Sequence, residues 1–227
     1  MFCDFPRLHV LSLESLKHVE LFILTGGPTE KNVVLIDDVV KKFVNLKHIQ
    51  AKGVDVHDLK KLKNLNSIHL KYCRSSETYG ALRPLLYRQK LEKLKINEHI
   101  DGFDSVQLLA PCSSNLKFLD IRQWPYGFFD SFECEFPKLR ILIARGSYYL
   151  NKDKLEYMMN NILSKCPKLR IYRMLGFRVE SRSFENILSL LKQYALHHPK
   201  RKIEFSYSWD CRMEVGSDCP ANLKITP

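Results

Sequence analysis

The sequence lacks several features that would place the protein in a familiar class at once. It has no apolar run approaching the roughly eighteen residues that a transmembrane helix needs. No Asn-x-Ser/Thr acceptor for N-linked glycosylation occurs, and residues 1–6 turn polar too early for a secretory signal peptide. These absences favour a cytoplasmic or nuclear protein over a secreted one.

Paired cysteine spacings are also lacking. The seven cysteines are an odd number, and no two of them form the Cys-x-x-Cys pair of a zinc site or a redox centre. We therefore expect free thiols, several of them small buried residues. His197, His198, Cys211 and Cys219 could in principle bind zinc, but no paired spacing supports this, and we expect no metal and no other cofactor.

The sequence has none of the motifs that mark common enzyme families. Residues 24–31, Leu-Thr-Gly-Gly-Pro-Thr-Glu-Lys, contain a glycine pair but lack the second Gly-Lys-Ser/Thr of a phosphate-binding loop. No Gly-x-Ser-x-Gly elbow and no His-Glu-x-x-His pair occur. We predict that the chain has no catalytic residues and is not an enzyme.

What the sequence does contain is a short apolar phrase that recurs seven times. Its clearest copy is residues 65–73, Leu-Asn-Ser-Ile-His-Leu-Lys-Tyr-Cys, with apolar residues at positions 1, 4, 6 and 9. The other copies begin at Leu16, Leu46, Leu91, Leu116, Leu139 and Leu169. Positions 4 and 6 have the two-residue period of a strand, and stacked units would bury their apolar rows as one core. The intervals between copies predict a solenoid.

Segments with helical spacing lie between some of the phrases. Residues 30–44, 152–163 and 183–196 carry apolar side chains at this spacing, with Ser183 as a candidate N-cap. We expect helices or loops there, on the back of the repeats.

The length of 227 residues fits one elongated domain, and no Gly/Ser-rich or Pro-rich linker divides it. We assign residues 1–207 to a solenoid of about seven divergent repeats and residues 208–227 to a polar C-terminal tail. Residues 202–207 alternate apolar and polar side chains, as a half-exposed edge strand does. Residues 5–13 are either a strand themselves or, as we favour, a fragment of a further repeat.

The phrase resembles the leucine-rich repeat, Leu-x-x-Leu-x-Leu-x-x-(Asn/Cys)-x-Leu, over roughly residues 16–180. The variable intervals, together with Phe-Pro-Lys-Leu at 136–139 and Cys-Pro-Lys-Leu at 166–169, are similar to the cysteine-containing repeats of F-box proteins. The resemblance implies an α/β solenoid, or horseshoe, with a parallel β-sheet on its concave face and helices or loops on its convex face. Only Cys73 carries the expected residue at position 9, so the repeats are divergent.

Side chains at positions 3, 5 and 7 alternate with the buried row and are expected on the concave face. They form a basic stretch opposed by few acids, followed by an apolar patch that includes Ile141, Ile171 and Leu175. The candidate partner-binding residues are Lys52, Lys71, Lys93, Lys95, Phe118, Arg122, Ile143, Arg145 and Arg173. Such a surface suits a protein segment with acidic or phosphorylated residues and an apolar anchor, unless a loop or the tail covers the patch and the lysines are simply solvated.

The sequence therefore predicts a protein–protein interaction module. Its resemblance implies substrate recognition for a ubiquitin ligase, but no F-box, the segment that binds the ligase's adaptor subunit, is recognised. A generic scaffold and an inhibitor-type repeat protein are the alternatives. Nucleic acid is less favoured, because the net charge of +11 comes from 36 basic residues spread among 25 acidic ones.

Overall fold

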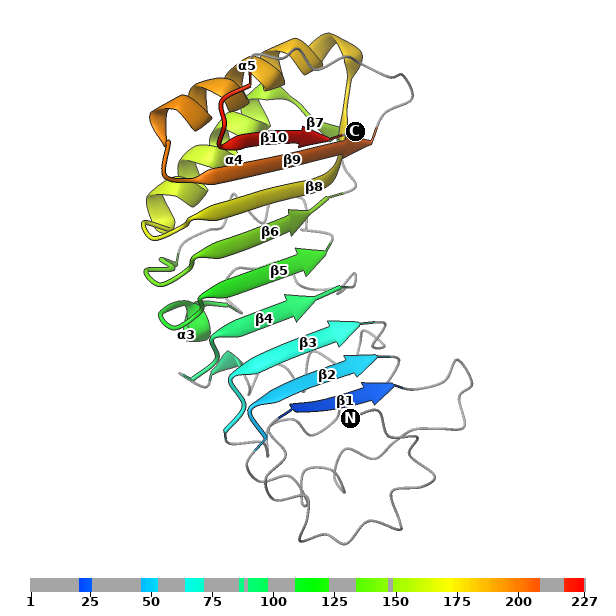
Figure 1. Ribbon diagram of the computed structural model, residues 1–227, viewed down its shortest axis with the longest axis vertical. Helices are drawn as coiled ribbons and strands as arrows, with labels where there is room; N and C mark the ends of the chain where they lie inside the picture. Colours follow the sequence, from blue (N-terminus) through cyan, green and yellow to red (C-terminus); the bar gives the residue numbers. More distant parts are fainter. Residues whose placement is uncertain are drawn as a thin grey trace, which may run out of the picture.

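The computed structural model describes residues 21–25, 46–52, 64–71, 86–87, 90–97, 109–122, 134–146, 149–208 and 219–226. Its elements in chain order are β1 (Leu21–Thr25), β2 (His48–Lys52), β3 (Ser67–Lys71), β4 (Lys93–Ile96), α3 (Ala110–Ser113), β5 (Phe118–Arg122), β6 (Ile141–Arg145), β7 (Tyr149–Leu150), α4 (Lys152–Lys165), β8 (Ile171–Val179), α5 (Ser181–His197), β9 (Lys202–Ser208) and β10 (Leu223–Thr226). Figure 1 shows the strands stacked along the long axis of the molecule.

The described strands form one open sheet in which every pair is parallel (Figure 1). The strand order is β1-β2-β3-β4-β5-β6-β8-β9-β10, and the two-residue β7 pairs with β8 off this path. Because the sheet order follows the chain order, each strand lies beside the one that precedes it in the sequence. This α/β arrangement, with few helices, is compatible with a solenoid.

The register of β2 to β8 agrees with the alignment of the repeated phrase. The residues at position 4 lie opposite one another in successive strands and are buried; they are Ile49, Ile68, Leu94, Leu119, Leu142 and Tyr172. The leucines at position 1, from Leu46 to Leu169, belong to the same buried cluster. The apolar rows of successive repeats therefore meet in one core, as the spacing predicted.

The register of β1 differs from the prediction. The alignment of the phrase placed Val19 opposite Ile49, whereas Phe22 lies opposite Ile49 and Leu24 opposite Ala51. This is a shift of three residues. Both candidate pairs of residues are apolar with a spacing of two, so the local pattern could not distinguish between the two registers.

The two long helices confirm the predictions for residues 152–163 and 183–196. Asn151 is the N-cap of α4, and its Oδ1 accepts a hydrogen bond from the backbone N–H of Lys154 at 2.9 Å. Helix α5 begins at Ser181, so the predicted N-cap at Ser183 is wrong; Glu180 takes this position without a side-chain cap bond. The helix predicted at 30–44 and the fragment predicted at 5–13 lie outside the described residues.

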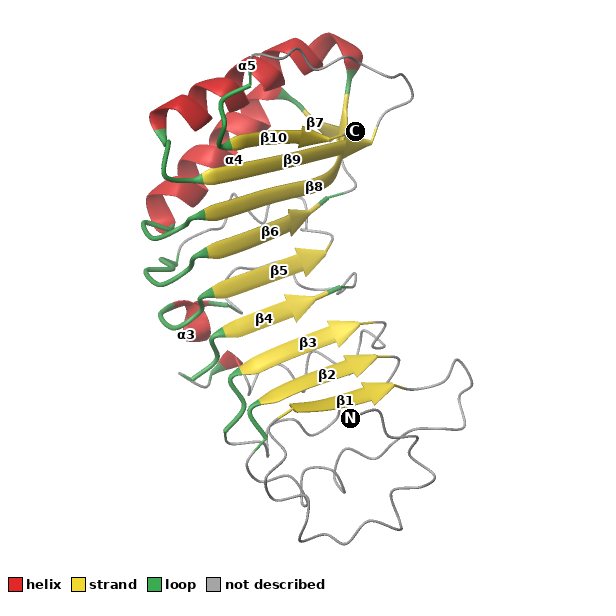
Figure 2. Cartoon of the chain, in the orientation of Figure 1, coloured by secondary structure: helices red, strands yellow, loops and turns green. Residues whose placement is uncertain are grey.

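Helices α4 and α5 cover the core face of the last strands, at the end of the sheet nearest the C-terminus (Figure 2). Their apolar sides join the same cluster as the strands, for example through Met159 of α4 and Ile187 of α5. The ring of Phe184 in α5 lies 5.1 Å from that of Tyr207 in β9, measured between centroids. The opposite face of the sheet carries none of the described helices.

The segment predicted as a polar tail contains the last strand of the sheet. β10 pairs with β9 in parallel, with Leu223 opposite Ile203, so residues 202–207 do not form the edge strand. The amide Nδ2 of Asn222 donates to the carbonyl oxygens of Ala195, His198 and Arg201, at 2.8, 3.2 and 2.9 Å. These bonds hold the start of β10 against the end of α5, and the burial of Leu223 adds an apolar contact.

Candidate binding face

The face of the sheet that points away from the core is called the open face here. It carries positions 3, 5 and 7 of the phrase. The strand register aligns each of these positions in a column that runs across the strands, and neighbouring residues of a column are about 4.8 Å apart. The position-3 column is His48, Ser67, Lys93, Phe118, Ile141, Ile171 and Lys202. The position-5 column is Gln50, His69, Lys95, Asp120, Ile143, Arg173 and Glu204. The structure thus brings together residues that are 19 to 31 positions apart in the sequence.

Four of the predicted basic residues have described side chains on this face. Lys93 is exposed, while the side chains of Lys95, Arg145 and Arg173 keep 32%, 36% and 39% of their surface exposed. The backbones of the other three lie in β2, β3 and β5, and their side chains lie outside the described residues; they are Lys52, Lys71 and Arg122.

Asp120 neutralises some of the charge in the basic stretch. Arg145 donates to it through Nε at 2.9 Å and through Nη2 at 3.2 Å, each bond to a different carboxylate oxygen. Lys95 Nζ lies 3.8 Å from the same carboxylate. Asp120 is only 1% exposed, so it is a buried charge that needs these cations. The sequence placed Asp120 in its column, but the pairing with Arg145 is diagonal across two strands and was not predicted.

Glu204 of β9, the strand that follows the last predicted repeat, also holds two cations on the open face. Arg173 Nε lies 2.5 Å from one of its carboxylate oxygens, and Lys202 Nζ lies 3.0 Å from the other. Burial acts to raise the pKa of Glu204, but the hydrogen bonds and charges of Lys202 and Arg173 outweigh it, so the pKa lies below its ordinary value. The alternation of residues 202–207 was the signal that could have extended the columns to this strand.

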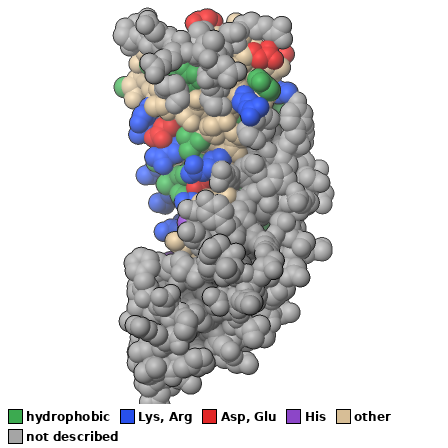
Figure 3. Space-filling view, turned by 90° about the vertical axis from the view of Figure 1, so that its right-hand side faces the viewer, with side chains coloured by type: hydrophobic (Ala, Val, Ile, Leu, Met, Phe, Trp, Pro, Cys, Tyr) green, Lys and Arg blue, Asp and Glu red, His purple; other side chains and the backbone are tan. Residues whose placement is uncertain are grey.

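Positive charge remains in excess among the described residues of the open face. Within the columns of positions 3, 5 and 7, six basic residues, Lys93, Lys95, Arg145, Arg173, Lys202 and Lys224, stand against two acidic ones, Asp120 and Glu204, which leaves a surplus of four. The side of the molecule that faces the reader in Figure 1 lies to the left in Figure 3, where Lys and Arg side chains gather with apolar and acidic ones among them. Each of these two acids holds two cations.

An apolar strip crosses three neighbouring strands of the open face. Phe118, Ile141 and Ile171 lie side by side in β5, β6 and β8, and each is half-buried. Lys93 precedes them and Lys202 follows them in the same column. Ile143 is only 5% exposed, so it supports the strip from within more than it offers surface to a partner.

The buried cysteines carry no site. Burial raises the pKa of the Cys112 and Cys166 thiols to about 12, so both are neutral and unreactive at physiological pH. In the portion of the chain that the structure describes, no group of three or more His, Cys, Asp or Glu side chains is placed to hold a metal ion. Cys211 of the zinc candidate lies outside the described residues.

Comparisons with known proteins found no match. No family model matches the chain, and neither a curated protein nor a solved structure does. Among the described helices, none combines the length and the apolar character needed to cross a membrane.

Proposed function

We propose that the chain is a leucine-rich-repeat solenoid whose open face, as the concave side of a horseshoe, binds a segment of another protein. The observation that carries the proposal is the half-buried strip of Phe118, Ile141 and Ile171, which has a lysine at either end of its column. An extended segment lying along the column would place an apolar side chain on the strip and acidic or phosphorylated side chains near the lysines.

The ion pairs of this face support a preformed site. Arg145 and Arg173 are held in place by Asp120 and Glu204, so binding a partner need not order these long side chains. Lys93 makes no ion pair with any described residue and stays available to an incoming carboxylate or phosphate. Since exposed charges contribute mainly to the rate and the specificity of association, the apolar strip would supply most of the affinity.

Selection from a displayed library of random 12-residue peptides, with and without phosphorylation, tests this function. We expect the selected peptides to share a large apolar residue close to Asp, Glu or a phosphorylated residue. Phe118→Ala should weaken the best peptide at least about tenfold, because a buried aromatic anchor contributes more than 1 kcal/mol. Lys93→Glu should weaken it by a similar factor and lower its dependence on salt.

Two substitutions on the helices serve as controls. Leu196→Ser removes an exposed apolar side chain from α5, and Lys152→Glu reverses a charge on α4. Both should leave peptide affinity within about twofold of the unmodified protein. Equal losses in all four variants, or a library that yields no peptide, would remove the support for this face as the binding surface.

Substrate recognition for a ubiquitin ligase is a narrower form of the same proposal and is based only on the resemblance to F-box proteins. Co-purification of the chain with the ligase's adaptor subunit would support it. Peptide binding without the adaptor would point to a scaffold or an inhibitor in the cytoplasm or the nucleus.

A further inference from the structure

The edge of the sheet where the strands begin has its own regular backbone ladder. In five successive repeats, the carbonyl oxygen of the residue after the first leucine accepts two hydrogen bonds from the next repeat; these residues are Lys47, Asn66, Glu92, Lys117 and Arg140. For Lys117 the two donors are the N–H groups of Arg140 and Ile141, at 2.9 and 3.2 Å, and for Arg140 they are those of Arg170 and Ile171, at 2.9 and 3.0 Å. The side chains of this row are therefore spaced by the strands themselves.

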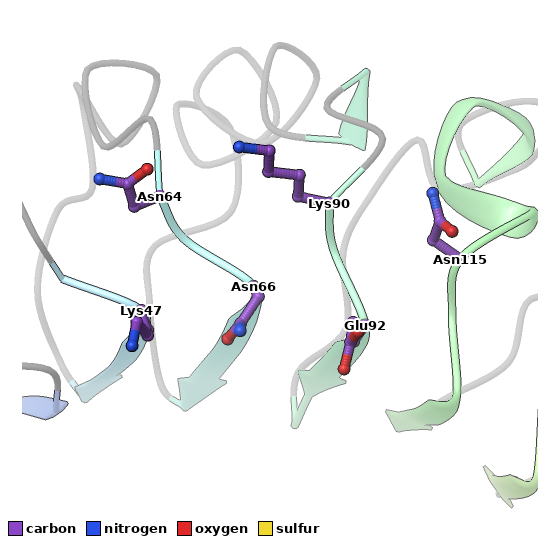
Figure 4. A pocket seen from close by; sticks show the side chains of 6 residues that line it. All are labelled: Lys47, Asn64, Asn66, Lys90, Glu92 and Asn115. Atoms are coloured by element: carbon purple, nitrogen blue, oxygen red, sulfur yellow. The ribbon is translucent and has the colours of Figure 1, made fainter.

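Two rows of polar side chains follow this edge. Figure 4 shows them in the first repeats around a shallow pocket, with Asn64, Lys90 and Asn115 in one row and Lys47, Asn66 and Glu92 in the other. The two rows are two residues apart along each chain segment, or roughly 7 Å. In these repeats the rows mix amides with charges of both signs.

From β5 onward the same rows become basic, except that Pro199 is in line with Lys168 and the neighbouring Lys200 supplies the charge. We call the following seven residues the basic edge: Lys117, Lys138, Arg140, Lys168, Arg170, Lys200 and Arg201. They lie in the segments 114–117, 134–140, 166–170 and 198–201, whose single acidic residue is Glu135. The basic edge spans three strand spacings, or about 14 Å. Along the sequence the positive charge is spread among acids, whereas the fold places these seven cations on one edge of the sheet.

Most of this charge is not compensated. Among the described residues, no acid forms an ion pair with Arg140, Lys168, Arg170 or Lys200, and all four of these side chains are exposed. Lys117 pairs with Glu92 at 2.7 Å, and Lys138 donates to the neutral amide oxygen of Asn115 at 2.7 Å. Like charges held this close raise the free energy of the folded protein, so an anion bound across them would relieve repulsion.

We propose that the basic edge binds the phosphate backbone of nucleic acid without regard to sequence. Besides the cations, the four segments carry Pro137, Pro167 and Pro199, the polar residues Ser114, Asn115 and Glu135, and the half-buried His198. None of their described Phe, Tyr or Trp side chains is exposed to stack on a base. Evenly spaced Lys and Arg side chains without such contacts match a phosphodiester chain, whose charges are regular and identical. An acidic polypeptide would gain more from the apolar strip on the open face.

Fluorescence anisotropy with a labelled, mixed-sequence 20-nucleotide single strand tests the proposal. We expect binding at 50 mM salt that weakens steeply as salt is added, with a log–log slope of about −3 for four contacted phosphates. Lys168→Gln combined with Arg170→Gln should reduce the affinity at least about tenfold and make the slope shallower by about 1.4.

A matched control removes one Lys and one Arg from the other edge of the sheet, where the strands end. Lys152→Gln combined with Arg178→Gln acts on residues at the start of α4 and the end of β8, and the affinity should stay within about twofold. Equal weakening of both double variants would show attraction to net charge alone and overturn the proposal, as would absence of binding at 50 mM salt. Binding of poly-glutamate in preference to the oligonucleotide, lost in the same edge variant, would assign the edge to an acidic polypeptide instead.

Discussion

Arg145 holds the carboxylate of Asp120 through two hydrogen bonds across the open face, diagonally from β6 to β5. The pair is buried on its acidic side and one-third exposed on its basic side. A buried carboxylate on the face opposite the core is costly unless cations surround it. The pair therefore fixes side chains of neighbouring repeats on the very surface that we propose for binding.

Removing Arg145 should cost more stability than removing Asp120. Arg145→Gln leaves the buried carboxylate with only Lys95, at 3.8 Å, and we expect a loss of about 2–3 kcal/mol in the free energy of unfolding. Asp120→Asn leaves cations that can reach water, and the loss should be about 1 kcal/mol. Urea unfolding followed by circular dichroism measures both, with Lys93→Gln as a control expected to change stability by less than about 0.5 kcal/mol. The reverse order of the two losses would contradict this account of the pair.

Asn222→Ala should loosen the last strand. The substitution removes three hydrogen bonds to the carbonyl oxygens at the end of α5, and we expect a loss of about 1–2 kcal/mol. Hydrogen exchange of the β10 amides should speed up more than that of β9. Asn186→Ala, at an exposed position of α5, is the control and should leave exchange in β10 unchanged. Unaltered β10 protection in Asn222→Ala would show that the pairing with β9 and the burial of Leu223 hold the strand without these side-chain bonds.

Gly146→Ala should strain the packing at the end of β6. A Cβ atom at this position would come close enough to collide with the fully buried ring of Phe177, and such overpacking costs about 1–3 kcal/mol. Adding Phe177→Leu should recover some of the loss, so the double variant should be more stable than the sum of the single effects predicts. Thermal unfolding of the four proteins measures this coupling, and strict additivity would place the cause of the loss elsewhere.

Glu204 should contribute stability that is lost in acid. Its pKa is lower in the folded chain than in the unfolded chain, because Lys202 and Arg173 outweigh the effect of burial. The contribution is therefore complete above the ordinary carboxyl pKa and disappears as the pH falls through the lower pKa of the folded protein. Urea midpoints measured from pH 7 to pH 3 should fall less for Glu204→Gln than for the unmodified chain. If the urea midpoints of the two proteins fall equally with pH, Glu204 does not make this contribution to stability.

The sequence was sufficient to predict the strands of the middle repeats. Pairs such as Ile68 and Leu70, or Leu94 and Ile96, have the two-residue period of a strand, and the leucine three residues before each pair fixes the register. β10 was missed because Leu223 and Ile225 are its only apolar residues, and a strand this short depends on Asn222 and on β9 for its place. Such tertiary contacts leave no periodic signal.

The columns of the open face were predictable as well, because they follow directly from the register. The register does not determine which side chains pair with one another across the columns. Asp120 meets Arg145 only through the twist and spacing of two strands, and Ile143 is covered by its neighbours although it alternates with the core. The basic edge could have been found by aligning the residues on either side of each first leucine, as Lys138, Arg140, Lys168 and Arg170 show.

The shared carbonyl oxygens at the starting edge mean that each coil is fastened chiefly to the one before it and the one after it. Loss of pairing between two middle strands would separate the sheet into two parts. In the part of the chain that the structure describes, the long helices α4 and α5 pack on the sheet only at its C-terminal end, beside β8 and β9. Unfolding of this chain should consequently proceed as fraying from the β1 end toward a resistant C-terminal block, and less as a single all-or-none event.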